Sequence, residues 1–214
     1  MNEILKRIGE IGVVPVIAIS DVEKAVPMAE ALIAGGIPCA EITFRTAEAE
    51  ECIRLIAAKF PQMLVGAGTV LRTEQADRAA AAGAKFVVSP GFNPRVVAHC
   101  VENNITIAPG CSNPSDMEAA LEFGLDVVKF FPAEQAGGLA YIKAVAAPYG
   151  NLKFMPTGGI NTGNLAKYLA FDRILACGGS WIVTKQLIEE GRFDEITRLC
   201  QEAIKIVKDS KCEE

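Results

Sequence analysis

Strand-like and helix-like segments alternate eight times along the chain, and this alternation limits the folds open to it. The strand-like segments are short apolar runs rich in β-branched residues, and glycines or capping residues bound many of the helices. The expected strands lie at residues 13–19, 40–44, 64–70, 86–89, 106–108, 126–131, 153–157 and 173–177. The helices that follow them are expected at residues 21–34, 48–59, 73–82, 94–103, 114–123, 139–147, 161–169 and 184–190.

Alternating units of this kind build a parallel sheet that helices cover. They repeat at about every 25 residues, and no linker or change in composition interrupts them, which favours a closed (β/α)8 TIM barrel over an open doubly wound sheet. We therefore predict an α/β fold with a single (β/α)8 barrel domain over residues 1–214. An amphipathic N-terminal helix at Met1–Ile8 precedes the barrel, and a C-terminal helix from Phe193 to Lys208 ends it.

Composition and charge argue against several classes of protein. The net charge is −5, aromatic residues make up 7% of the chain and no basic run is present, so nucleic acid is not an expected partner. No apolar stretch has the length of a signal peptide or of a membrane span, and we expect a cytoplasmic protein with no membrane partner.

The seven cysteines are scattered without a CxxC motif, so reduced thiols are expected. His99 is the one histidine, which excludes a site built from several histidines. No motif surrounds His99, and we interpret it as a structural or surface residue.

Charged residues inside the predicted strands indicate where chemistry could take place. In a TIM barrel the functional residues lie at the carboxyl ends of the strands, so charged residues that begin a strand are expected to be structural. That group comprises Lys85, Asp126, Lys153 and Arg173. The charged residues that remain are Glu41, Arg45 and Lys129.

Side chains alternate between the two faces of a strand, so Glu41 and Arg45 share one face of the second strand. If that face and the face with Lys129 both point into the barrel, Glu41 and Lys129 meet across the interior. A buried ammonium is costly unless it is paired or loses its proton, and the neutral amine is a nucleophile for carbonyl carbons. The alternative is a lysine whose charged end reaches water at the end of its strand.

The chemistry of a 2-keto acid fits this set of residues. Lys129 would condense with the ketone to a Schiff base, and Glu41 would carry protons to and from the substrate. Arg45 can bind a carboxylate with two parallel hydrogen bonds. The run Gly66–Thr69 allows close approach of a ligand to the backbone and ends in the hydroxyl of Thr69.

Glycine-rich stretches follow the seventh and eighth strands, at residues 156–161 and 177–181. Free amides in such loops bind anions, and phosphate sites recur at this place in TIM barrels. Two ordinary tight turns are the structural alternative.

Six motifs in order along nearly the whole chain resemble the KDPG/KHG aldolase family. The motifs are Glu41-Ile42-Thr43-Phe44-Arg45-Thr46, Gly66-Ala67-Gly68-Thr69-Val70, Ser89-Pro90-Gly91, Lys129-Phe130-Phe131-Pro132-Ala133-Glu134, Pro156-Thr157-Gly158-Gly159-Ile160 and Gly178-Gly179-Ser180-Trp181. The family consists of class I aldolases that act on 2-keto-3-deoxy-6-phosphogluconate (KDPG) and 4-hydroxy-2-oxoglutarate (KHG).

The resemblance implies a role for each matching residue. Lys129 matches the Schiff-base lysine and Glu41 the acid/base glutamate, while Arg45 and Thr69 match residues that hold the pyruvate portion. The residues that match the phosphate loops are Thr157, Gly158, Gly159 and Ser180. The resemblance also implies a homotrimer that needs neither metal nor cofactor.

Other functions remain open at the level of sequence. The galactonate-derived substrate differs from KDPG in the orientation of one hydroxyl. The same fold could instead serve an isomerase or a synthase, in which Lys129 only binds charge. A barrel that senses a phosphorylated metabolite would keep the phosphate loops without needing Glu41 and Lys129 together.

Overall fold

The computed structural model describes residues 1–211, and parallel strands alternate with helices throughout this part of the chain. The strands are β1 (Val13–Ile17), β2 (Cys39–Thr43), β3 (Leu64–Gly68), β4 (Phe86–Val88), β5 (Ile107–Ala108), β6 (Val127–Phe130), β7 (Lys153–Pro156) and β8 (Cys177–Gly179). The helices between and after them are α2 (Ala25–Ala34), α3 (Ala49–Lys59), α4 (Thr73–Ala81), α5 (Pro94–Glu102), α6 (Pro114–Glu122), α7 (Gly138–Ala146), α8 (Leu165–Leu169) and α9 (Lys185–Glu189). Helix α1 (Glu3–Ile11) precedes β1, and α10 (Phe193–Lys211) ends the described chain.

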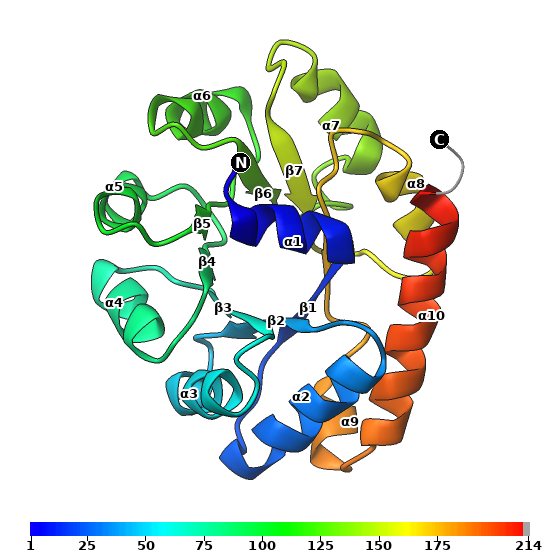
Figure 1. Cartoon of the computed structure of the whole chain (residues 1–214). Coiled ribbons are helices and arrows are strands. Elements are labelled where there is room, and N and C mark those ends of the chain that lie inside the picture. Colours follow the sequence, from blue (N-terminus) through cyan, green and yellow to red (C-terminus); the bar gives the residue numbers. More distant parts are fainter. Residues whose placement is uncertain (212–214) are drawn as a thin grey trace.

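The strands pair in two parallel sheets. Six strands follow the order β5-β4-β3-β2-β1-β8, and β6 pairs with β7. Isolated parallel bridges connect these sheets at both ends, from Gly110 to Lys129 and from Thr157 to Gly178. Figure 1 shows the strands around a common centre with the helices on the outside. The α/β alternation predicted from the sequence is therefore confirmed, with a curled parallel sheet.

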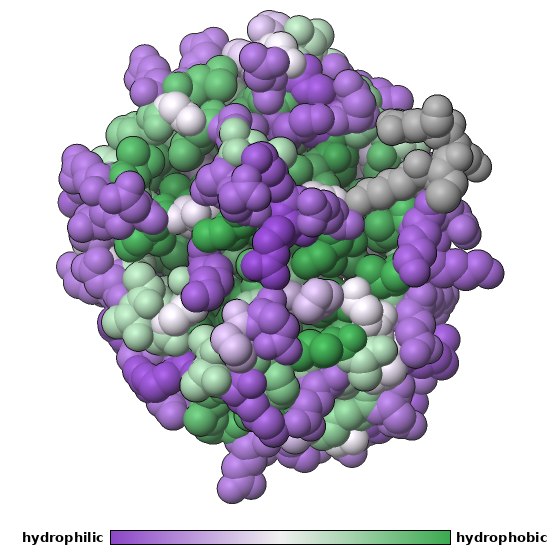
Figure 2. Space-filling view, viewed as in Figure 1, coloured by the Kyte–Doolittle hydropathy of each residue, from purple (hydrophilic) through white to green (hydrophobic). Residues whose placement is uncertain are grey.

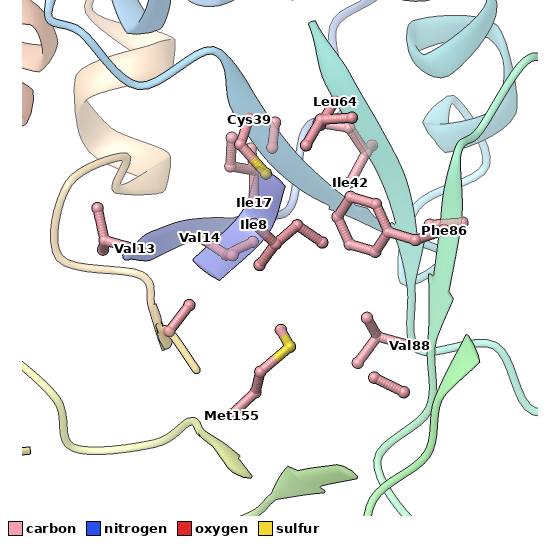
Figure 3. Close-up of a cluster of buried hydrophobic side chains, with 14 of the residues drawn as sticks. Ile8, Val13, Val14, Ile17, Cys39, Ile42, Leu64, Phe86, Val88 and Met155 are labelled. Atoms are coloured by element: carbon pink, nitrogen blue, oxygen red, sulfur yellow. The ribbon is translucent and has the colours of Figure 1, made fainter. Parts of the chain in front are cut away.

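Apolar side chains fill the space that the strands surround. Figure 3 shows Val14 of β1, Phe86 and Val88 of β4, and Met155 of β7 in one cluster with Ile8 of α1. Gly66 makes room for the largest of them, because a Cβ at Gly66 would lie 2.3 Å from the ring of Phe86. The interior is thus a packed core rather than a channel.

Helix α1 lies across the centre of the ring of strands in Figure 1. Asn2 caps this helix, since its side chain accepts a hydrogen bond from the amide of Leu5. Leu5 and Ile8 are its buried residues. The opposite end of the curled sheet, where the strands reach their carboxyl ends, is consequently the end left for a binding site.

Figure 2, in the same view as Figure 1, shows hydrophilic residues over much of the outer helices, with apolar residues between them. Within residues 1–211, no helix combines the length and the apolar character needed to cross a membrane.

Two predicted boundaries are wrong near the end of the chain. The eighth strand begins at Cys177, not at Arg173, and Ile174 makes only an isolated bridge to Phe154. Strand β8 therefore contains Gly178 and Gly179, which pair with Val14 and Pro15 of β1, instead of leaving them to a loop. Glycine has a low strand propensity, so the prediction placed the strand on the apolar residues before Gly178 and not on the glycines themselves.

Helix α8 is the other correction, because it begins at Leu165 and not at residue 161. The side chain of Asn161 accepts from the amide of Gly163, and that of Asn164 accepts from the amide of Asn161. These bonds hold residues 161–164 in a turn before the helix.

Candidate active site

Lys129 and Glu41 form an ion pair inside the ring of strands. Lys129 belongs to β6 and Glu41 to β2, and Nζ of the lysine lies 3.3 Å from Oε1 of the glutamate. Only 5% of Lys129 and 1% of Glu41 is exposed. The structure therefore brings together two charged residues that lie 88 positions apart in the chain, and it withholds both from bulk water.

The neighbouring strand β3 makes room for the glutamate. Gly68 is paired with Thr43 across the β2–β3 ladder, and a Cβ at Gly68 would lie 2.2 Å from Oε1 of Glu41. No other residue type would fit while this carboxylate keeps its position. Glycine at residue 68 thus determines where the Glu41 carboxylate lies.

An aromatic ring lies beside the amine of Lys129. The ring centroid of Phe131 is 5.5 Å from Nζ of Lys129, within the range of a cation–π contact. Phe131 is 38% exposed, although it directly follows a fully buried strand. Phe131 lies two residues after Lys129, so the alternation of side chains along a strand accounts for their place on the same side.

Arg45 and Thr69 extend from the ends of two paired strands. Arg45 is exposed, and its Nε donates a 3.1 Å hydrogen bond to Oγ1 of Thr43. Thr43 is buried and donates in turn to the carbonyl of Ile17, at 2.9 Å. The sequence offered one sign of this contact, since Thr43 shares a strand face with Arg45.

Thr69 directly follows β3 and has a φ of +58°, in the left-handed region. Residues other than glycine rarely adopt this conformation, and a β-branched residue does so least readily. Backbone strain of this kind gathers at functional sites, so it marks Thr69 independently of its sequence motif.

The segment after β7 contains two successive glycines in left-handed conformation, Gly158 with φ +102° and Gly159 with φ +81°. Within residues 1–211, the amides of these two glycines donate to no protein acceptor. Successive free amides in such a turn form a concave anion-binding site.

Strand β8 lies beside this turn. Thr157 is buried and forms a bridge with Gly178, and its hydroxyl has no hydrogen-bond partner within the described chain. A Cβ at Gly178 would lie 2.2 Å from that hydroxyl, so the glycine lets the two strands approach. Ser180 follows β8 directly and is exposed.

His99 and the described cysteines lie away from this group of residues or serve packing. Nε2 of His99 is 2.6 Å from Oδ1 of Asp77, between the outer helices α5 and α4, in agreement with a surface role. The cysteines of the described chain are buried and free of disulfides, as expected. Cys212 lies outside the described residues.

Comparison with known proteins gives a consistent result. Residues 4–199 match the family model for KDPG and KHG aldolase. A protein of Treponema pallidum named 2-dehydro-3-deoxy-phosphogluconate aldolase is 53% identical over 97% of this chain and 99% of its own length.

Solved structures of the same family also resemble the chain. A KDPG aldolase from Legionella pneumophila, with pyruvate captured as a covalent carbinolamine intermediate, has a TM-score of 0.88 at 39% identity and covers 91% of this chain and 97% of its own. The 2-keto-3-deoxy-6-phosphogluconate aldolase of Zymomonas mobilis with 3-phosphoglycerate has a TM-score of 0.87 at 41% identity and covers 95% of both chains.

Proposed function

The chain belongs to the KDPG and KHG aldolase family, and we propose that it cleaves KDPG to pyruvate and glyceraldehyde 3-phosphate through a Schiff base on Lys129. The observation that carries this proposal is the buried Lys129–Glu41 pair, with 3.3 Å between amine and carboxylate. An amine and a proton carrier in direct contact are what imine formation requires.

The reaction begins when Glu41 accepts a proton from Lys129. The neutral amine attacks the C2 ketone of the substrate to form a carbinolamine, and Glu41 returns the proton as the hydroxyl leaves as water. The product is an iminium ion, which withdraws electrons from the neighbouring bonds. Glu41 lies 3.3 Å from the nitrogen, so one carboxylate serves both proton transfers.

Cleavage breaks the bond between C3 and C4. Glu41 takes the proton of the C4 hydroxyl as the aldehyde forms, and the electron pair of the bond moves into the enamine. Glu41 then protonates C3 of the enamine, and water hydrolyses the resulting iminium to pyruvate and free Lys129. The same steps convert 4-hydroxy-2-oxoglutarate to pyruvate and glyoxylate.

Arg45 and Thr69 hold the carboxylate end of the substrate. The guanidinium of Arg45 is exposed at the end of β2, and its Nε is oriented by Thr43. Its remaining N–H groups are available for a carboxylate. Thr69 adds a hydroxyl from the neighbouring strand end.

The phosphate at the other end of KDPG lies against Thr157, Gly158, Gly159 and Ser180. The unpaired hydroxyl of Thr157 and the free amides of the two glycines support this placement. Hydrogen bonds from backbone amides are well suited to a phosphate. KDPG is therefore preferred over substrates without a phosphate.

Two wider features belong to the same proposal. The single bridges between the two sheets support a closed eight-stranded (β/α)8 barrel. A homotrimer in the cytoplasm is expected from the family resemblance, and sedimentation equilibrium tests the trimer.

A coupled assay tests the function directly. Pyruvate release is followed from KDPG, from its galactonate-derived epimer and from 4-hydroxy-2-oxoglutarate, with the highest kcat/KM expected for KDPG. Lys129→Ala should abolish pyruvate release. Lys153→Ala should keep it, because Lys153 is the first residue of β7 and the proposed site lies at the carboxyl ends of the strands. A protein that releases no pyruvate from any of the three would overturn the proposal.

A further inference from the structure

Glu134 belongs to the motif that contains Lys129, yet none of the steps above uses it. Its carboxylate accepts a hydrogen bond from the hydroxyl of Tyr168, which lies in α8. Tyr168 is only 2% exposed, so its hydroxyl has little access to water and depends on this partner. Burial first, and then the bond to Glu134, raise the pKa of Tyr168, so the hydroxyl keeps its proton at neutral pH and remains the donor.

The stem of Glu134 packs on one of the proposed phosphate-binding glycines. A Cβ at Gly159 would lie 2.6 Å from Cγ of Glu134. On its carbonyl, Gly159 accepts hydrogen bonds from Nδ2 of Asn164 at 3.0 Å and of Asn161 at 3.2 Å. Gly159 is therefore held between the glutamate stem and two asparagine side chains.

Backbone hydrogen bonds join the same two loops. The amide of Ala133 donates to the carbonyl of Thr157 at 2.8 Å, and the amide of Glu134 donates to the carbonyl of Gly158 at 3.1 Å. These bonds turn both carbonyls toward the loop after β6 and leave the glycine amides free for a ligand. The loop that follows Lys129 thus shapes the loop that would bind phosphate.

We propose that Glu134 and Tyr168 are positioning residues that fix the Gly158–Gly159 turn, and that they set the preference for phosphorylated over unphosphorylated keto acids. The inference rests on the proposed phosphate site. Without the tyrosine hydroxyl the Glu134 side chain is free to leave Gly159, and the glycine amides lose their common direction. The carboxylate end of the substrate and the Lys129–Glu41 pair are untouched by this change.

The test compares two substrates in variants of the pair. In Tyr168→Phe we expect kcat/KM for KDPG to fall about tenfold, mainly through KM, because binding groups lose their alignment. The value for 4-hydroxy-2-oxoglutarate, which has no phosphate, should stay within about twofold. Glu134→Ala should reproduce this shift, and Glu134→Gln, which still accepts from Tyr168 and covers Gly159, should restore most of the preference.

The chain offers a matched control. The hydroxyl of Tyr149 also bonds a glutamate, Glu118, at 3.4 Å, on the outer surface. Tyr149→Phe should leave the ratio of the two kcat/KM values unchanged. Thermal unfolding of each variant shows whether it is folded, and Glu134→Ala tests the same pair if Tyr168→Phe is unstable.

Ser180→Ala separates failure of this inference from failure of the phosphate site. If Ser180→Ala selectively weakens KDPG cleavage but Tyr168→Phe and Glu134→Ala do not, the positioning role is wrong and the phosphate site stands. If all three variants change both substrates equally, the phosphate site and the inference built on it are both overturned. Absence of KDPG cleavage in the unaltered protein would instead refute the proposed function.

Discussion

The buried Glu41–Lys129 ion pair is expected to contribute little to the stability of the fold, and this favours a chemical role for it. Burying two charges costs several kcal/mol per ion, and their attraction offsets this only with good geometry and further hydrogen bonds. Here Nζ of Lys129 lies 3.3 Å from a carboxylate oxygen of Glu41. The ring of Phe131 lies beside the amine. Such a pair is a weak argument for stability and a better one for chemistry.

Gly68 is the residue on which the position of Glu41 depends. In Gly68→Ala the new Cβ would lie 2.2 Å from Oε1 of Glu41, so the carboxylate must move away from its present place. We predict that kcat for KDPG cleavage falls about 100-fold, as when a general acid–base group is removed, while Glu41→Gln gives a loss of similar size.

Gly150→Ala is the matched control, because nothing lies within 4 Å of a Cβ at Gly150. Steady-state kinetics and circular dichroism are measured for all three variants. Turnover by Gly68→Ala at the unaltered rate, with an intact fold, would refute this account of the glycine.

Thr43 orients Arg45 through the hydrogen bond between their side chains. Thr43→Val removes the acceptor for Nε of Arg45, a bond of 3.1 Å, and leaves the guanidinium free to turn. The loss of about 1 kcal/mol corresponds to a rise in KM of about fivefold, with kcat little changed. Thr43→Ser, which keeps the hydroxyl, should restore KM, and a Thr43→Val effect confined to kcat would contradict the role.

Among the elements, strands β2 and β6 of the proposed active site were predicted more accurately than β8. The alternation of side chains along β2 and β6 was enough to predict that Glu41 and Lys129 meet. In a strand, successive side chains point to opposite faces, so the face of each residue follows from its position. The position of β8 could not be found in this way, because Gly178 and Gly179 carry no apolar pattern. They pair with β1, and both positions require glycine because Thr157 and Trp181 occupy the space that a side chain would fill.

Helix α1 was also predicted, but its place across the centre of the curled sheet was not. Its residue Ile8 is completely buried among side chains of several strands (Figure 3). Ile8→Ala should lower the free energy of unfolding by about 2 to 5 kcal/mol, through lost burial and the cavity left behind. Urea denaturation measures this, and Val101→Ala, at an exposed residue, should change it by less than about 0.5 kcal/mol. Equal effects of the two changes would show that α1 does not seal the core.

For the whole molecule, the packing of helices against the curled sheet withdraws the cysteines of residues 1–211 from solvent. Burial raises the pKa of the Cys52 and Cys100 thiols to about 11 and of the Cys111 and Cys200 thiols to about 12. In an unfolded chain a thiol ionises near pH 8.5. The stability that these neutral thiols contribute is therefore complete below about pH 8.5 and is lost as the pH rises toward 11 and 12.

The consequence is low reactivity in the folded protein. At pH 8 these four thiols should resist iodoacetamide for as long as the chain is folded, and react within minutes in guanidinium chloride, because the thiolate is the reactive form. Peptide mass spectrometry identifies each modified residue. Rapid alkylation of any of the four under native conditions would contradict the burial on which this prediction rests.

The proposed chemistry depends on Lys129 as the amine that forms the imine, and chemical trapping of that imine tests this role. The protein is incubated with pyruvate, reduced with borohydride and digested, and the modified lysine is located by peptide mass. A reduced pyruvate adduct is predicted on Lys129, retained at least in part in Glu41→Gln and absent from Lys129→Ala. An unaltered protein that yields no adduct, or an adduct on another lysine, would contradict the mechanism.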